Sequence, residues 1–283
     1  MIPAQFEYVR PGSVDEAVAA LSEHGDDAKV LAGGQSLIPL LRLRLSYPEV
    51  VVDVGRVGEL VGVRDDGDHL VIGAMTTHHD VMHDELVRRH AGLLPEATGT
   101  VADPAVRHRG TFGGSLAHAD PAGDLPAVAV AMAAEMVVAG GNGRRTVPAS
   151  EFFVDYLQTA VQPDELLVEV RLPKMEGWGF RYEKFHRVAQ SWAIVGVAAA
   201  VKRSNGSIAE ARVALTNMGP TPVRANAVEQ ALSGAGTDAV TAAAEHAADG
   251  SSAPSDLNGR SDYRDHLARV LTRRAVLAAA GEG

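Results

Sequence analysis

Two glycine-rich runs, each with a hydroxyl side chain beside it, are the parts of this sequence best suited to bind an anion. The first reads Ala32-Gly33-Gly34-Gln35-Ser36, after the largely apolar run Ala28-Lys29-Val30-Leu31 and before a leucine-rich segment at helical spacing. We interpret it as a strand, a tight turn and the start of a helix. Glycine allows positive φ and close approach of a ligand, and free N–H groups at a helix start attract negative charge. The run is therefore a candidate phosphate-binding loop.

A glycine pair between a strand and a helix is also common as a plain structural turn in α/β proteins. The spacing here matches neither the P-loop nor the glycine motif of the Rossmann fold. A second signal is needed to favour the phosphate-binding interpretation.

The second run, Thr111-Phe112-Gly113-Gly114-Ser115, supplies that signal. It belongs to a stretch from Arg109 to Pro126 that is rich in glycine, proline, hydroxyl and aspartate residues and poor in apolar ones. We expect such a segment to be held by something other than a hydrophobic core. Asp124 precedes an apolar run, as a residue at a helix N-terminus does. Two glycine–hydroxyl loops, each beside an apolar element, favour one extended diphosphate of dinucleotide type over two structural loops.

Histidines raise a separate chemical question, because three of them are grouped in His78-His79-Asp80-Val81-Met82-His83. His79 and His83 would share one face of a helix, as metal ligands can. Neither an HExxH nor a Glu-x-x-His pattern surrounds them. We expect a polar, solvated helix face rather than a metal site.

Composition narrows the classes of function. The 283 residues carry 26 Lys and Arg against 36 Asp and Glu, a net charge of -10, and no basic run suited to a nucleic-acid backbone. The chain has no cysteine, so it offers no thiolate for a disulfide, an iron–sulfur cluster or a nucleophile. Electrons that pass through it would need an organic cofactor. Because neither a signal peptide nor an apolar run of about 18 residues is present, we expect a soluble cytoplasmic protein without a transmembrane segment or a nucleic-acid partner.

The predicted elements divide the chain into two domains, 1–176 and 177–283, with the boundary in the stretch 174–179. The first domain is predicted to contain both helices and strands. Its first helix follows the capping box of Ser13 and Glu16. Its strands are predicted at 28–31, 50–54, 60–63, 69–72, 135–139 and 164–173. Thr76 or Thr77 would cap the helix that follows the fourth of these strands. The second domain is predicted as a three-stranded antiparallel sheet with a helical layer. The strands are predicted at 180–188, 192–202 and 207–216, and the helices at 223–232, 237–247 and 261–280.

Together the motifs closely resemble the FAD-binding medium subunits of aerobic carbon monoxide dehydrogenases, which belong to the molybdenum hydroxylases, as xanthine dehydrogenase does. The resemblance covers essentially the whole chain and is carried by Ala32-Gly33-Gly34-Gln35-Ser36-Leu37-Ile38-Pro39, by Ile72-Gly73-Ala74-Met75-Thr76-Thr77 and by the stretch from Arg109 to Pro126. It implies an α+β, two-subdomain FAD-binding fold of the PCMH/vanillyl-alcohol-oxidase type, followed by the flavoprotein C-terminal domain. His108 is a departure, since the family often has Asn there.

The resemblance also assigns contacts to FAD. The loops 32–36 and 111–115 would hold the pyrophosphate, and Asp124 would bind a ribitol or ribose hydroxyl. His118 would lie near the phosphates, without the covalent link to FAD that some relatives of the fold form. Leu167 would contact the adenine side.

Two further contacts come from the second domain. Lys184 would lie at the flavin ring, where a cation stabilises the anion of reduced flavin. Trp192 would lie beside the isoalloxazine, although a core tryptophan at the start of a strand explains it equally well. No residue is expected to be catalytic or to bind a metal. The full set of implied contacts is Ala32, Gly33, Gly34, Gln35, Ser36, Leu37, Thr76, Thr77, Thr111, Gly113, Gly114, Ser115, His118, Asp124, Leu167, Lys184 and Trp192.

The implied function is electron transfer through FAD within a heteromeric enzyme. A large subunit would oxidise the substrate at a molybdopterin cofactor, a small iron-sulfur subunit would carry [2Fe-2S] clusters, and this chain would pass electrons to quinone, NAD or oxygen. The implied assembly is an (LMS)2 heterohexamer, cytoplasmic or peripheral at the inner membrane face. Carbon monoxide, purines, nicotine-like heterocycles and aldehydes are all open as substrates.

Two other functions fit the same fold. One is a stand-alone FAD-dependent oxidoreductase, against which the second domain's lack of an acid–base pair or a nucleophile constellation argues. The other is a scaffold that has lost FAD, against which the intact glycine loops argue.

Overall fold

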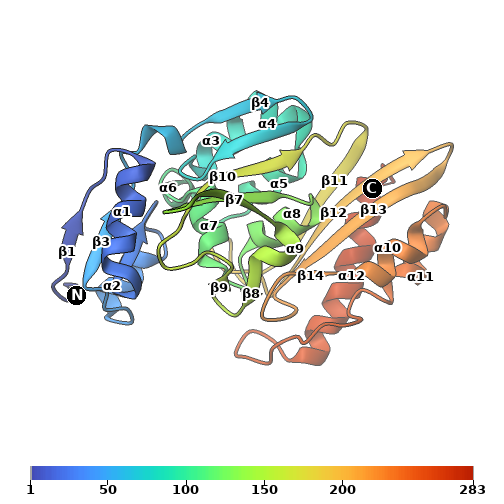
Figure 1. Ribbon diagram of the computed structural model, residues 1–283. Helices are drawn as coiled ribbons and strands as arrows, with labels where there is room; N and C mark the ends of the chain where they lie inside the picture. The colour runs from blue at the N-terminus through green and yellow to red at the C-terminus, as the bar shows by residue number, and fades with distance from the viewer. Residues whose placement is uncertain (1, 283) are drawn as a thin grey trace.

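The computed structural model describes residues 2–282. The molecule is elongated, and an N-terminal, a central and a C-terminal unit follow one another along it, with the two termini toward opposite ends (Figure 1). Within residues 2–282, every helix is either too short or too polar to cross a lipid bilayer.

The N-terminal unit is a three-stranded parallel sheet with the strand order β1-β3-β2. Its first helix, α1, begins where the capping box predicts, because the Ser13 hydroxyl accepts a hydrogen bond from the Glu16 N–H. The second helix, α2, follows β2 directly after the first glycine run, so the predicted strand, turn and helix are all present. The elements are β1 (Glu7–Val9), α1 (Val14–His24), the 3-10 turn η1 (Gly25–Asp27), β2 (Ala28–Leu31), α2 (Leu37–Leu43) and β3 (Val50–Asp53).

The central unit is a five-stranded antiparallel sheet with the order β4-β5-β10-β6-β7. The two ends of β10 face different cores. Val170 and Leu172 pack with the helices of the central unit, whereas Leu166 and Val168 pack with α1 of the N-terminal unit. A β-bulge between Leu167 and Glu169 causes the change, because one extra residue reverses the face to which the following side chains point. The strands are β4 (Val63–Asp66), β5 (His69–Gly73), β6 (Glu135–Gly140), β7 (Gly143–Pro148) and β10 (Leu166–Pro173), with a small hairpin of β8 (Phe153–Asp155) and β9 (Gln158–Thr159).

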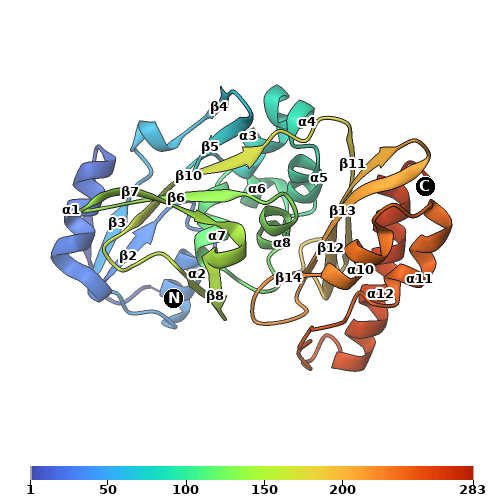
Figure 2. The same ribbon diagram turned by 45° about the vertical axis from the view of Figure 1, so that its right-hand side comes forward.

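The helices of the central unit lie mostly on one face of this sheet (Figure 2). They are α3 (His78–His83), α4 (Glu85–His90), α5 (Leu93–Gly99), α6 (Pro104–Arg107), α7 (Phe112–His118), α8 (Asp124–Ala131) and α9 (Ala149–Phe152).

Two expectations for the central unit were wrong. The predicted strand at 60–63 begins later, because Gly62 adopts φ +110 and the preceding residues form a 3-10 turn, η2 (Gly58–Leu60). The stretch 109–126 was expected to be held by something other than a core, yet α7 fully buries Phe112 and Leu116. Two apolar residues four positions apart are enough to anchor this stretch in the core, because both side chains point inward from one face of α7.

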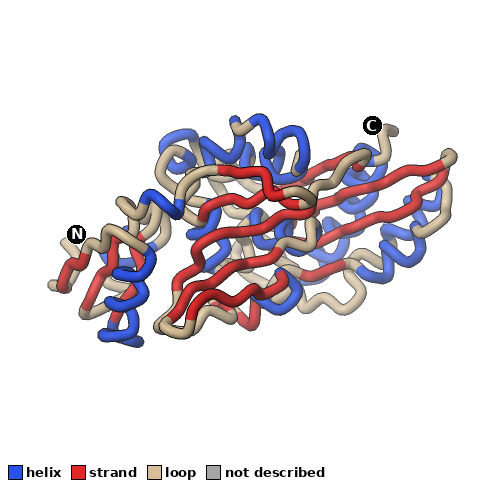
Figure 3. The backbone as a smooth tube through the Cα atoms, turned by 45° about the horizontal axis from the view of Figure 1, so that its top comes forward, coloured by secondary structure: helices blue, strands red, loops and turns tan. Residues whose placement is uncertain are grey.

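The C-terminal unit is an antiparallel sheet with the order β11-β12-β13-β14, backed by helices on its outer face (Figure 3). The prediction of three strands was wrong, because residues 223 and 224 pair with the open edge of β13 before the helix begins. Such a two-residue strand is too short to leave a periodic pattern. The elements are β11 (Trp178–Phe185), β12 (Val195–Ser204), β13 (Ser207–Thr216), β14 (Val223–Arg224), α10 (Asn226–Leu232), the 3-10 turn η3 (Thr237–Ala239), α11 (Val240–Ala244) and α12 (Ser261–Ala279).

Strand β12 divides its side chains between the two faces of this sheet. Val195 and Val197 pack with the outer helices, whereas Ala198 and Ala200 face the central unit. Small side chains on the inner face allow α8 to approach the sheet closely. The C-terminal unit thereby brings β11 against α5 and the start of α8.

Candidate cofactor-binding site

The two glycine runs lie against each other. A Cβ atom added at Gly33 would overlap the carbonyl oxygen of Arg109 and lie 2.8 Å from the Cα of Gly110, so glycine is required there. A Cβ atom added at Gly114 would lie 3.5 Å from that of Ala32. The turn after β2 and the start of α7 thus form one surface from distant parts of the sequence.

The first run presents unused backbone donors. Gly34 adopts φ +75, which turns the chain from β2 into α2. Among residues 2–282, the backbone N–H groups of residues 33–37 donate to no protein acceptor, and Ser36 makes no side-chain cap bond at the start of α2. Free N–H groups at a helix start are the donors that bind a phosphate group. These residues therefore fit the diphosphate of FAD.

The second run is built differently, because its backbone donors are engaged. The N–H groups of residues 112–115 donate to the carbonyl oxygens of Thr76 and Ala74 and to the hydroxyl and carbonyl oxygens of Thr111. The Ser115 hydroxyl donates to a carbonyl of the same turn at 2.8 Å. The second run thus supplies a shaped surface and hydroxyl oxygens, whereas the first supplies N–H donors.

Thr76 and Thr77 position the second run. The buried Thr76 hydroxyl donates to the Gly62 carbonyl at 3.1 Å and accepts from the Gly62 N–H at 2.9 Å. The Thr77 hydroxyl caps α3, as predicted, by accepting from the Asp80 N–H at 3.1 Å. A backbone bridge joins Thr77 to Thr111. Both hydroxyls are therefore committed within the protein.

Asp124 and Lys184 come together from two units of the fold. Lys184 Nζ lies 2.8 Å from Oδ2 of Asp124 and donates to the Thr100 carbonyl at 3.1 Å. The Lys184 and Asp124 side chains are 3% and 4% exposed. Burial raises the pKa of the Asp124 carboxyl, and the Lys184 ammonium opposes that rise. The pair is a buried carboxylate and cation at the start of α8.

A third member of this cluster, Tyr182, was not predicted from the sequence; its hydroxyl donates to Oδ1 of Asp124 at 2.7 Å. Tyr182 and Lys184 are two residues apart in β11, so both side chains lie on the face of the sheet that meets α8. That spacing is the signal that could have predicted Tyr182.

The remaining predicted contacts differ in their surroundings. His118 is half-buried at the end of α7. Leu167 is buried and its side chain packs in the main core. Trp192 lies in the connection from β11 to β12 and is 56% exposed, so the alternative of a core tryptophan was wrong. Gln190 of the same connection donates to the Asp103 carboxylate at 2.7 Å, which ties this connection to the central unit.

The histidine group lies beside the second run. The His79 ring is 3.9 Å from that of His108 and 4.3 Å from that of His83, measured between ring centres. Within residues 2–282, no group of three His, Cys, Asp or Glu side chains is arranged to hold a metal ion. His78 is buried against Gly110, and burial lowers its pKa to about 4.

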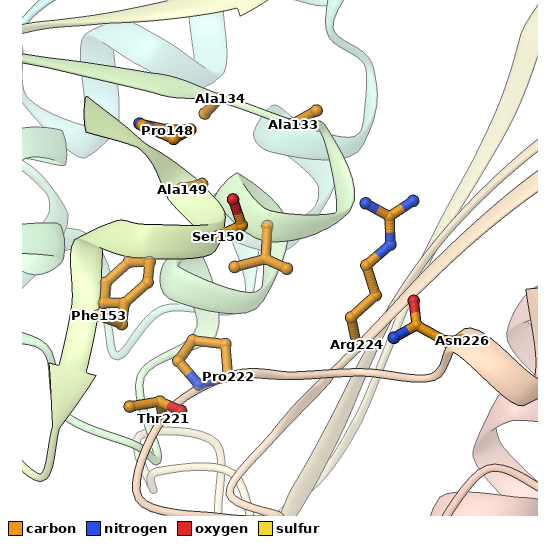
Figure 4. A pocket seen from close by; sticks show the side chains of 11 residues that line it. Ala133, Ala134, Pro148, Ala149, Ser150, Phe153, Thr221, Pro222, Arg224 and Asn226 are labelled. Atoms are coloured by element: carbon orange, nitrogen blue, oxygen red, sulfur yellow. The ribbon is translucent and has the colours of Figure 1, made fainter. Parts of the chain in front are cut away.

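A cavity of about 410 Å3 lies elsewhere, between the central and C-terminal units (Figure 4). It is lined by the end of α8, the start of α9 and β14, and by none of the predicted FAD contacts. Arg224, which lines it, is paired with Glu229 at 2.9 Å. This cavity is separate from the candidate cofactor site.

Comparison with known sequences gives the class of protein to which this fold belongs. The family described as the FAD binding domain in molybdopterin dehydrogenase matches residues 4–175. The family described as the CO dehydrogenase flavoprotein C-terminal domain matches residues 180–279. The chain therefore belongs to the family of FAD-binding oxidoreductase subunits that combine these two domains.

Individual relatives match over their whole length. The chain is 43% identical to the carbon monoxide dehydrogenase medium chain of Hydrogenophaga pseudoflava, covering 99% of this chain and 98% of that protein. It is 39% identical to the caffeine dehydrogenase subunit beta of a Pseudomonas species, covering 99% and 96%. A solved structure of carbon monoxide dehydrogenase from Hydrogenophaga pseudoflava superposes with a TM-score of 0.97 at 44% identity, covering 100% of this chain and 99% of that one. The agreement confirms the expected α+β FAD-binding fold.

Proposed function

We propose that this chain is the FAD-binding electron-transfer subunit of a heteromeric molybdenum hydroxylase of the carbon monoxide dehydrogenase type. The observation that carries the proposal is the pair of touching glycine runs, with free N–H donors on residues 33–37. The relatives are named as medium chains or subunits, which does not favour a stand-alone oxidoreductase.

The proposed partners are a large subunit with the molybdopterin cofactor and a small subunit with [2Fe-2S] clusters, in a cytoplasmic (LMS)2 heterohexamer. The absence of cysteine from this chain supports the placement of the clusters on another subunit. Quinone, NAD and oxygen are the proposed classes of electron acceptor. Full-length relatives of similar identity are named for carbon monoxide and for caffeine, which supports the proposal that the large subunit determines the substrate.

The proposed binding mode divides the work between the units. Residues 33–37 donate to the diphosphate, and the second run forms the wall beside them, in which Gly114 leaves room for the Thr111 hydroxyl. Asp124 accepts from a hydroxyl of the cofactor, and Lys184 places a positive charge at the flavin ring. FAD, when bound, supplies the reversible uptake and release of electrons. We place the domain boundary between residues 1–176 and 177–283. The contact of Lys184 with the flavin ring would therefore come from the second domain.

The heteromeric complex, produced with its other subunits, provides the test. We expect the wild-type complex to carry FAD and Gly33→Val to lose it, because the new side chain would overlap the Arg109 backbone. Gly141→Val is the matched control, since a Cβ there meets no atom within 4 Å. A wild-type complex without flavin, or equal flavin content in both variants, would contradict the proposed site.

A further inference from the structure

The Tyr182 hydroxyl lies at the centre of a buried polar cluster. It donates to Oδ1 of Asp124 at 2.7 Å and lies 3.4 Å from the Thr216 hydroxyl. Its side chain is buried, and burial and the neighbouring Asp124 carboxylate raise its pKa well above the usual value, so it is a neutral donor. Tyr182 therefore holds one oxygen of the carboxylate, and Lys184 holds the other.

The surrounding strands leave space for this hydroxyl. Gly196 of β12 pairs in register with both Lys184 and Thr216. A Cβ atom at Gly196 would lie 2.5 Å from the Tyr182 oxygen and 3.0 Å from the Cβ of Thr216. Because the missing side chain makes the room, the position of the hydroxyl is fixed by the sheet itself rather than by the cofactor loops.

The hydrogen bond controls both charged groups. A carboxylate held at one oxygen only can rotate about its terminal bond, and its second oxygen would be buried without a donor. Rotation of the Asp124 carboxylate would move the oxygen that accepts from the Lys184 ammonium. Among residues 2–282, that ammonium has one other hydrogen-bond acceptor, the Thr100 carbonyl. Loss of the Tyr182 hydroxyl would therefore displace two side chains at once.

We propose that Tyr182 is a positioning residue for FAD: its hydroxyl orients Asp124 and, through Asp124, holds Lys184 at the flavin ring. This role rests on the proposed function, because it assumes that Asp124 and Lys184 contact FAD. The hydroxyl itself does not need to touch the cofactor.

The test uses the assembled complex, depleted of flavin and titrated with FAD. Tyr182→Phe keeps the ring and should weaken FAD binding about tenfold, as expected for one lost hydrogen bond to a charged group. Because Lys184 stabilises the anion of reduced flavin, its displacement should cost reduced FAD about tenfold more affinity than oxidised FAD, which lowers the midpoint potential by about 30 mV. Tyr156→Phe, at an exposed tyrosine of the β8–β9 hairpin, is the matched control and should change neither value.

A second pair of variants protects the test against misfolding. Gly196→Ala should push the Tyr182 oxygen and weaken FAD binding, and it should weaken binding less when Tyr182→Phe is already present. Additive effects of the two changes would overturn the proposal. So would a lower melting temperature of the flavin-free Tyr182→Phe complex with an unchanged potential.

Asp124→Asn separates this proposal from the proposed function. If Asp124→Asn weakens FAD binding and Tyr182→Phe does not, the role of Tyr182 is overturned and the cofactor site stands. If neither variant changes FAD binding, the cofactor site itself is overturned.

Discussion

Asp124 and Lys184 form a buried ion pair across the contact between the central and C-terminal units, with 2.8 Å between Oδ2 and Nζ. A buried pair is not automatically stabilising, because removing both charges from water offsets their attraction. The importance of this pair lies instead in its position between two units of the fold. The C-terminal unit contributes the cation, whereas the two glycine runs belong to the other two units, so the proposed site draws on all three.

Replacing one partner of this pair should cost more stability than replacing both. Lys184→Met leaves the Asp124 carboxylate buried without its cation, and we expect the free energy of unfolding to fall by about 3–5 kcal/mol. Lys184→Met combined with Asp124→Asn removes both charges and should restore part of that loss. Urea unfolding of the chain measures both values. A double variant less stable than the single one would show that the charges do not determine the effect.

Gly179 should be intolerant of any side chain, because β11 and α12 meet there through their backbones. An added Cβ would overlap the carbonyl oxygen of Ala279 and lie 3.0 Å from its carbonyl carbon. Gly179→Ala should therefore destabilise the chain by about 1–3 kcal/mol, as overpacking does. Gly58→Ala is the control, since a Cβ there meets no atom within 4 Å. Similar melting temperatures for the two variants would contradict this close contact.

Acid should destabilise the protein through His78. Burial lowers the pKa of His78 to about 4 in the folded state from 6.5. As the pH falls from about 6.5 to about 4, the unfolded chain takes up a proton that the folded chain does not, so stability decreases over that range. The loss reaches about 3 kcal/mol below pH 4. His78→Gln should flatten this part of the profile of unfolding free energy against pH, and an unchanged profile would exclude His78 as the cause.

The sequence predicts those features whose causes are local. Ser13 and Glu16 lie within one helical turn, so their capping box fixes the start of α1. Gly33 and Gly34 mark the turn between β2 and α2 because positive φ and close backbone approach both require glycine. Such signals depend on residues a few positions apart and can be read without knowing the tertiary structure.

Features that depend on distant partners could not be predicted in the same way. Tyr182 donates to Asp124 across 58 positions of sequence, and its spacing of two from Lys184 indicates only that the two share a face of β11, not that Asp124 is the partner. The second run has the same glycine and hydroxyl pattern as the first. Its backbone N–H groups, however, donate to carbonyl oxygens within the protein, among them those of Thr76 and Ala74. Tertiary packing determines which of two similar motifs has free N–H groups.

Trp192 should report the binding of FAD by fluorescence. The chain has 2 tryptophans, and they differ in environment: Trp192 is exposed, whereas Trp178 is partly buried, with the Arg212 guanidinium 4.9 Å from its ring centre. If Trp192 lies beside the isoalloxazine, stacking with the flavin should quench its emission when FAD is added to the flavin-depleted complex. Trp192→Phe should then remove most of the quenching and change the unfolding free energy by less than about 0.5 kcal/mol, because the side chain is exposed. Trp178→Phe is the matched control and should leave the quenching in place. If quenching survives in Trp192→Phe and disappears in Trp178→Phe, the flavin lies on the β11 side and Trp192 is not its neighbour.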